Sequence, residues 1–169
     1  PALERTYIVM INTKNRRLEL RGAMGLARLT HHPSDDVKGA GKHIAKKTGS
    51  KRTVAMTGGV EALDGMIRRA SAGYAKCVLA ARAARARMES ASETEDAADD
   101  AAAALREKQA SGVKVTREEK LAAEMAAAEA EEARRDAEEA SEEAAENEEM
   151  VGSHARALVY ALSAFLNLS

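Results

Sequence analysis

The chain has 169 residues, of which 26 are Lys or Arg and 27 are Asp or Glu, so its net charge at pH 7 is −1. The aromatic residues are one Phe and three Tyr, and alanine supplies much of the apolar content. A chain so poor in large side chains does not form a large compact core. Its single cysteine, Cys77, excludes an internal disulfide, and its place in an apolar helical row favours a buried, unreactive thiol.

The first residues predict short strands. Residues 6–11 are rich in β-branched and aromatic side chains, as strands are. A turn at 12–15 would join them to residues 16–21, in which leucines alternate with charges, so a small β-hairpin is expected. An isolated hairpin is marginally stable in water and would need a partner. Residues 23–30 predict a short helix.

A basic segment follows. A helix is expected from Ser34, its N-cap, to about residue 47, and residues 50–59 then form a linker. We therefore divide the chain into a basic N-terminal segment, 1–58, and the remainder, 59–169. Lysines at every fourth position of the helix share a face, which can neutralise phosphates without reading sequence. The candidate contacts to nucleic acid or a protein partner are Lys38, Lys42, Lys46, Lys47, Lys51 and Arg52.

Two long helical stretches, 59–110 and 116–167, dominate the chain. Apolar residues recur in both at alternating spacings of four and three, the pattern of helices that supercoil around a partner. Gly112 can take a positive φ and end the first helix, and Thr116 with Glu119 forms a capping box for the second. A connection this short makes the helices antiparallel neighbours. We predict a mainly α fold with a long, alanine-rich antiparallel helical hairpin, a coiled coil.

We call the two apolar rows the seam. Because most of its members are alanines, each layer of the seam buries little apolar area. The larger residues gather at the open end of the hairpin, where Leu63, Ile67 and Tyr74 are expected to face Leu158, Leu162 and Phe165. In the second helix the seam comprises Ala126, Ala130, Ala133, Ala137, Ala140, Ala144, Asn147, Val151, His154, Leu158, Ala161 and Phe165.

The end of the second helix has apolar residues on more than one face. They cannot all point at one partner helix, so the N-terminal segment, another subunit or both must cover the surplus. The residues predicted to form an assembly contact are Leu158, Tyr160, Leu162, Phe165 and Leu166.

Charge is divided between the two halves of the chain. Residues 1–88 hold 18 Lys/Arg and 6 Asp/Glu, a net charge of +12, whereas residues 89–169 hold 8 and 21, a net charge of −13. Such an asymmetry indicates a charged partner, either nucleic acid or a protein surface, and pairing between copies would neutralise both halves.

The sequence contains short stretches that resemble a phosphate-binding loop or a metal site, but none of them has the full set of residues that such a site needs. Residues 39–43, Gly-Ala-Gly-Lys-His, lack the first glycine and the hydroxyl residue of a phosphate-binding loop. His154 lies on the seam and is expected to be packed or hydrogen-bonded. The polar loop residues that could suggest a metal site lack helical ligand spacing and are better explained as solvated; they are His31, His32, Asp35, Asp36 and His43. We expect no enzymatic activity, no metal and no cofactor.

These features favour a non-enzymatic structural subunit of a large assembly, most naturally a virion component such as a phage head, neck, tail or internal protein. Its partners would be copies of itself and other subunits. The alternative is a nucleic-acid-binding module of ribosomal or packaging type that uses residues 38–52. No signal peptide is visible, and the apolar run 157–166 is too short to span a bilayer, so a virion or cytoplasmic location is expected.

Overall fold

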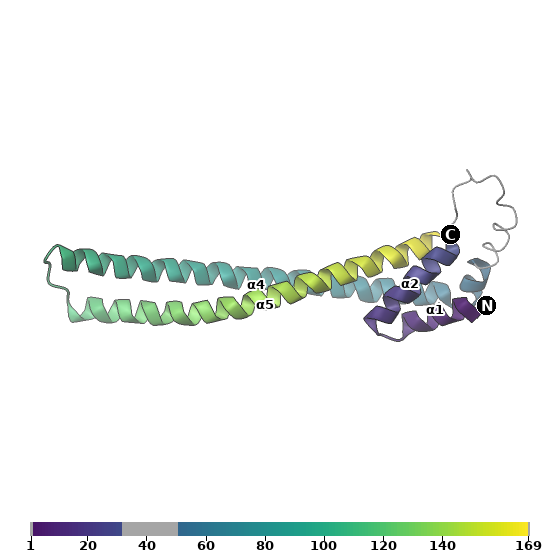
Figure 1. Ribbon diagram of the computed structural model, residues 1–169, viewed down its shortest axis with the longest axis horizontal. Coiled ribbons are helices and arrows are strands. Elements are labelled where there is room, and N and C mark those ends of the chain that lie inside the picture. Colours follow the sequence, from purple (N-terminus) through teal and green to yellow (C-terminus); the bar gives the residue numbers. More distant parts are fainter. Residues whose placement is uncertain (1, 32–50, 169) are drawn as a thin grey trace, which may run out of the picture. The chain divides into compact units, whose positions relative to one another are not determined.

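The computed structural model describes residues 2–31 and 51–168, and the secondary structure within them is helical. Its labelled helices are α1 (Ala2–Asn12), α2 (Arg16–Thr30), α4 (Gly59–Ala110) and α5 (Arg117–Leu166), shown in Figure 1. Residues 51–56 are helical as well. The two long helices predicted from the sequence are confirmed. The predicted helix that begins at Ser34 lies outside the described residues.

The chain forms two compact units, which we describe separately. Unit 1 comprises Pro1–Lys76 and Met150–Ser169, and unit 2 comprises Cys77–Glu149.

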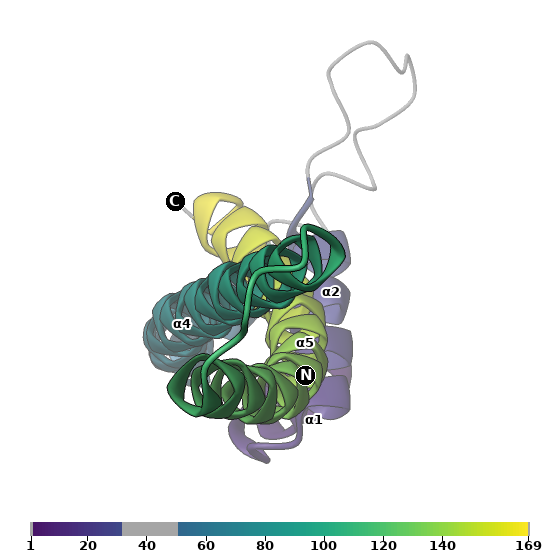
Figure 2. The ribbon, with the colours of Figure 1, turned by 90° about the vertical axis from the view of Figure 1, so that its left-hand side faces the viewer.

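The predicted β-hairpin at residues 6–21 is wrong, because these residues form α1 and the start of α2. Asn15 caps α2, and its side-chain oxygen accepts hydrogen bonds from the backbone N–H groups of Arg17 and Leu18 at 3.1 and 3.3 Å. Helical packing overrides the strand propensity of these residues. A Cβ on Gly22 would lie 2.7 Å from the Tyr7 carbonyl oxygen, so glycine allows α1 to approach α2 closely (Figure 2). Residues 13–15, within the expected turn, connect α1 to α2, and the helix expected at 23–30 is the second half of α2.

The core of unit 1 combines side chains from every described helical segment of that unit. The expected linker at 50–59 is wrong, because residues 51–56 are helical and Val54 is fully buried. A Cβ on Gly59 would lie 2.3 Å from Cγ1 of Val54, so the two segments pack tightly. The fully buried residues of this core are Ile11, Ala23, Leu26, Val54, Leu63, Met66, Ala70, Ala157, Ala161 and Ala164.

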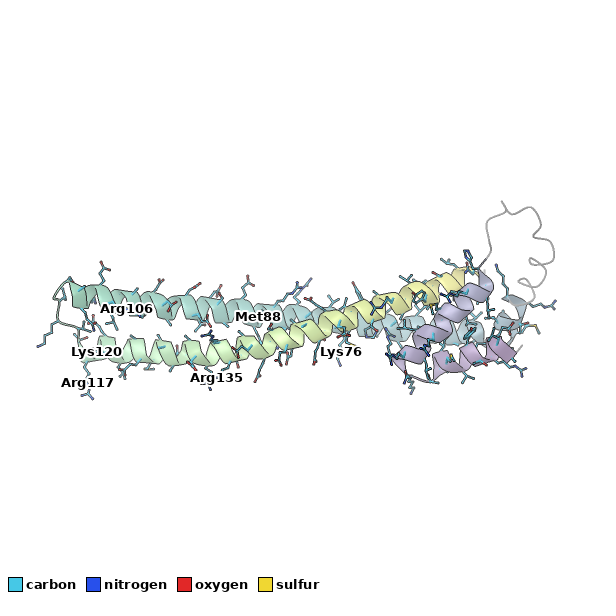
Figure 3. All side chains as sticks on the ribbon, viewed as in Figure 1. Lys76, Met88, Arg106, Arg117, Lys120 and Arg135 are labelled. Atoms are coloured by element: carbon cyan, nitrogen blue, oxygen red, sulfur yellow. The ribbon has the colours of Figure 1, made fainter. Side chains whose placement is uncertain are left out.

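Unit 2 is a long helix packed against another helix, and the two run antiparallel. Ion pairs connect Arg85 with Glu148, Arg87 with Glu143 and Lys108 with Glu119, so residue numbers rise along α4 as they fall along α5. The buried cluster of the unit is small. It contains Ala84, Ala140 and Ala144, with Met88 packed against it (Figure 3).

The predicted break between the long helices is confirmed in detail. Gly112 has a φ of 73°, and the N–H of Val113 donates to the carbonyl oxygen of Lys108 at 3.0 Å, which closes the end of α4. The N–H of Thr116 donates to Glu119 Oε2 at 2.9 Å, and the N–H of Glu119 donates to Thr116 Oγ1 at 3.2 Å. This reciprocal pair is the capping box that begins α5.

The predicted seam is the least exposed row along α5 in unit 2. Ala140 and Ala144 are buried, and Ala126, Ala130, Ala133, Ala137 and Asn147 are half-buried. On α4, Ala81, Ala84 and Ala91 are buried, whereas Glu95 is exposed.

Candidate assembly surfaces

The C-terminal part of α5, within unit 1, turns its small residues inward and its large residues outward. Ala157, Ala161 and Ala164 are fully buried in the core. Successive residues of a helix are about 100° apart around its axis. The large exposed side chains between these alanines therefore lie on one side of the helix, within an arc of about 120°. We call them the α5 patch: Val159, Leu162, Phe165 and Leu166, with exposed fractions of 61%, 45%, 38% and 70%.

The five predicted assembly residues separate into two groups. Leu158 and Tyr160 are half-buried and pack against the core of unit 1, and Tyr160 also lines a shallow hollow beside Ala27 of α2. Leu162, Phe165 and Leu166 belong to the α5 patch. The N-terminal helices therefore cover part of the apolar surplus and leave part of it in solvent. Sequence reasoning missed Val159, which the same surplus of large residues on this helix could have indicated.

The expected packing at the open end of the hairpin is partly wrong. Leu63 is buried and Ile67 packs against the core, but Tyr74 is 39% exposed, and Leu162 and Phe165 face solvent. The alanines of α5 occupy the core positions instead. Their small size permits a close approach of the two helices within unit 1. At Gly73 an added Cβ would lie 2.1 Å from the imidazole of His154.

A cluster of polar side chains, which we call the polar node, lies beside this contact and consists of Arg16, Glu19, Arg69 and His154. Arg69 donates to Glu19 Oε1 from Nη2 at 2.8 Å and from Nε at 3.1 Å, and Arg16 lies 3.4 Å from Glu19 Oε2. Arg16 Nη2 and His154 Nδ1 are 2.7 Å apart, so the prediction that His154 is packed or hydrogen-bonded is confirmed. Burial lowers the pKa of His154, repulsion from the Arg16 guanidinium lowers it further, and the Glu19 carboxylate opposes the shift.

The connection between α4 and α5 has its own charge arrangement. The hydrogen bond from Lys108 and that from the Thr116 backbone lower the pKa of Glu119 to about 2. Arg106, Arg117 and Lys120 lie near this connection in Figure 3. Counting residues 106–120, five Lys/Arg and three Asp/Glu give this end of unit 2 a net charge of +2 within an otherwise acidic unit.

Most of the predicted basic cluster lies outside the described residues. Lys51 is half-buried and Arg52 is exposed, whereas Lys38, Lys42, Lys46 and Lys47 fall in the undescribed segment. A different basic row is visible on α2. Its members, Arg17, Arg21 and Arg28, are exposed and are spaced four and seven residues apart, so they share one face of the helix. Sequence reasoning missed this row because it placed residues 16–21 in a strand.

The rejected motifs give no chemical centre in the part of the chain that is described. Residues 39–43 and the histidines and aspartates near them lie outside it, except for His31. Among the described residues no group of three or more His, Cys, Asp or Glu is placed to hold a metal ion. Cys77 is half-buried rather than buried, which corrects the expectation for its side chain.

A search of the described helices finds none long and apolar enough to cross a membrane. Comparison with known proteins gives no match, whether to a family model, to a curated protein or to a solved structure.

Proposed function

We propose that the chain is a non-enzymatic structural subunit of a large assembly and that it joins its neighbours through the α5 patch. One observation carries this proposal: the alanines of α5 fill the core of unit 1, while its larger residues Leu162, Phe165 and Leu166 face solvent. A contiguous exposed group of large apolar side chains favours a protein interaction surface. A virion component is the type of assembly that we favour, with copies of this chain and other subunits as its partners.

Helix geometry supports the same proposal. In unit 2 the least exposed residues follow the alternating four and three spacing, which favours coiled-coil packing of α4 against α5. Such rods are typical of structural proteins. Their alanine layers bury little area, so neighbouring subunits would contribute to their stability.

The experiment compares native masses of the full chain at micromolar concentration. We expect the wild-type chain to form species larger than a monomer. Replacing Leu162 and Leu166 together with Glu should lower this mass, because charge on an apolar contact opposes association. Ser71→Glu, which adds charge at an exposed site of unit 1 outside the patch, is the matched control. A wild-type chain and a double variant of equal mass would contradict the proposal.

A nucleic-acid-binding module is the second candidate, favoured by the exposed arginine row of α2. None of Arg17, Arg21 and Arg28 forms an ion pair with another described residue, so their charges are available for phosphates. We propose that this row and the basic segment 38–52 would bind the backbone together. Titration with duplex DNA and with RNA at two salt concentrations tests it. Replacement of the three arginines by Gln should weaken binding and reduce its salt dependence. Binding that responds neither to salt nor to this replacement would contradict the second candidate.

A further inference from the structure

The distal arm of unit 2, residues 92–139, forms two helical segments without a buried residue. Even the seam alanines of this stretch are only half-buried. Leu121 and Met125 are each 57% exposed, and they stand one helical turn apart on α5. Two helices alone do not exclude water from this region.

Apolar residues surround both helices at one level of the arm. Residues 101–105 contain no charge, and residues 121–128 contain only Glu124. A shallow hollow between the helices is lined by Ala101, Ala104 and Leu105 from α4 and by Ala122 and Ala123 from α5, with the Lys108–Glu119 ion pair also at its edge. The two apolar stretches therefore lie side by side. We call them together the apolar band. Helices that are apolar all round are normally covered by further protein.

The stretches on the two sides of the apolar band carry net charges of opposite sign. The end of the arm, residues 106–120, has a net charge of +2. On the other side, residues 89–100 hold six acidic and no basic residues, and residues 129–149 hold eleven acidic and two basic residues, giving −6 and −9. The band therefore separates a cationic end from an anionic stretch.

We propose that a second copy of this chain covers the apolar band, with the two distal arms packed antiparallel about a two-fold axis at the band. This arrangement places the cationic end of each copy beside the anionic stretch of the other, and the same surface is used twice, as in a closed symmetric dimer. A parallel arrangement would align like charges, which is unfavourable. An anionic bilayer is disfavoured as the occupant because the stretch behind the band is strongly acidic. The proposal rests on the proposed function and deepens it, since the arm gives the subunit a second contact besides the α5 patch.

The first experiment measures native mass and dissociation constant of the full chain by sedimentation at micromolar concentration. The α5 patch is blocked with Leu162→Glu and Leu166→Glu, and this protein is expected to remain a dimer. Adding Leu121→Glu and Met125→Glu should raise its dissociation constant about 30-fold or more, as loss of central contact residues does. Leu79→Glu, at a 64% exposed site of unit 2 outside the distal arm, is the control and should leave the dimer intact. Glu is a good helix former, so circular dichroism should show retained helicity in each protein.

The outcomes separate the two proposals. A patch-blocked protein that is monomeric, or a dimer that is indifferent to the changes at Leu121 and Met125, would overturn the arm contact. If the wild-type and patch-blocked chains were both dimers of equal mass, the α5 patch of the proposed function would be contradicted and the arm contact would stand. A monomer that binds phosphatidylglycerol vesicles through Leu121 and Met125 would assign the band to a membrane surface and overturn the dimer.

The second experiment exchanges charges across the proposed two-fold axis. If the axis passes near residue 103 of α4, Arg106 of one copy lies close to Asp100 of the other. Arg106→Asp and Asp100→Arg should each weaken the patch-blocked dimer, by roughly fivefold, because each places like charges together twice. Mixing the two variants should restore association, since both contacts in the mixed dimer join opposite charges. Absence of enrichment of the mixed dimer over the two separate ones would overturn the antiparallel arrangement.

Discussion

Glu19 is the residue on which the polar contacts of unit 1 converge. Glu19 is 5% exposed, and its carboxylate accepts hydrogen bonds from Arg16 and Arg69. Arg69 Nη2 also donates to the carbonyl oxygen of Ile11 at 3.1 Å. A buried carboxylate is tolerated only when such partners compensate for the loss of water. Glu19 therefore connects α2 to α4, and its partner Arg69 extends the connection to the end of α1.

Glu19→Gln should lower the free energy of unfolding by about 1–3 kcal/mol, because it removes the charge but keeps the volume. Asp64→Asn is the matched control. Its partner Arg68 has a side chain that is 79% exposed, so solvent screens the pair and a change within about 0.5 kcal/mol is expected. Urea denaturation measures both values. If the two variants lose equal stability, the node does not hold the helices together.

His154 should make the stability of unit 1 depend on pH. The folded state lowers its pKa below the ordinary value of 6.5, so the unfolded chain binds a proton more readily than the folded one. The neutral His154 side chain therefore contributes its full stability above pH 6.5, the ordinary pKa of histidine, and this contribution is lost as the pH falls below that value. We expect wild-type stability to decrease from about pH 7.5 to about pH 5.5, and the decrease should be smaller in His154→Gln. Identical pH profiles for the two proteins would contradict this account.

At the scale of the helix, Gly73 fixes how closely α4 and α5 approach within unit 1. Gly73→Ala should destabilise the protein by about 1–3 kcal/mol, because the new Cβ overlaps the His154 ring. Gly152→Ala is the matched control on the opposite helix. Its Cβ would meet only Arg156 Nη1, at 3.9 Å, so the better helix propensity of alanine should stabilise the protein by about 0.5–1 kcal/mol. Thermal denaturation should give shifts of opposite sign, and shifts of the same sign would disprove the close contact.

The long helices could be predicted from the sequence almost to the residue, because their periodicity persists over many turns and their break is encoded locally by Gly112, Thr116 and Glu119. The N-terminal helices could not. Residues 6–11 favour a strand by propensity, and only tertiary contacts, such as those at Gly22, decide otherwise. Surplus apolar residues near the end of α5 indicated a contact surface. Which of them face solvent depends on how closely the alanines approach the core, which periodicity alone does not specify.

At the scale of the whole molecule, the two units differ in how they are stabilised. The fully buried large side chains, among them Leu26, Leu63 and Met66, belong to unit 1. The buried cluster of unit 2 consists of alanines, and the larger residue packed against it, Met88, is half-buried. Unit 2 therefore depends more on helix propensity and on association than unit 1 does. Counting Lys/Arg against Asp/Glu gives unit 1 a net charge of +10 and unit 2 a net charge of −11, so contacts between copies should weaken as salt is added.

Phe165→Ala should separate assembly from folding. Because Phe165 is 38% exposed and lies outside the core, its truncation should cost less than the about 3–5 kcal/mol typical of a buried Phe. In dilute solution the variant should therefore melt close to the wild-type temperature. At higher concentration, association should raise the melting temperature of the wild-type chain by mass action, and this rise should shrink in the variant.

Ala133→Gly provides the comparison, because it weakens a helix by about 1 kcal/mol without touching the α5 patch. Its melting temperature should be lowered by a similar amount at every concentration, with the rise on association retained. Differential scanning calorimetry over a hundredfold range of concentration would measure all three proteins. If Phe165→Ala gains as much stability on concentration as the wild-type chain, the α5 patch is not where subunits meet, because a large aromatic side chain at the centre of a protein contact carries much of its binding energy.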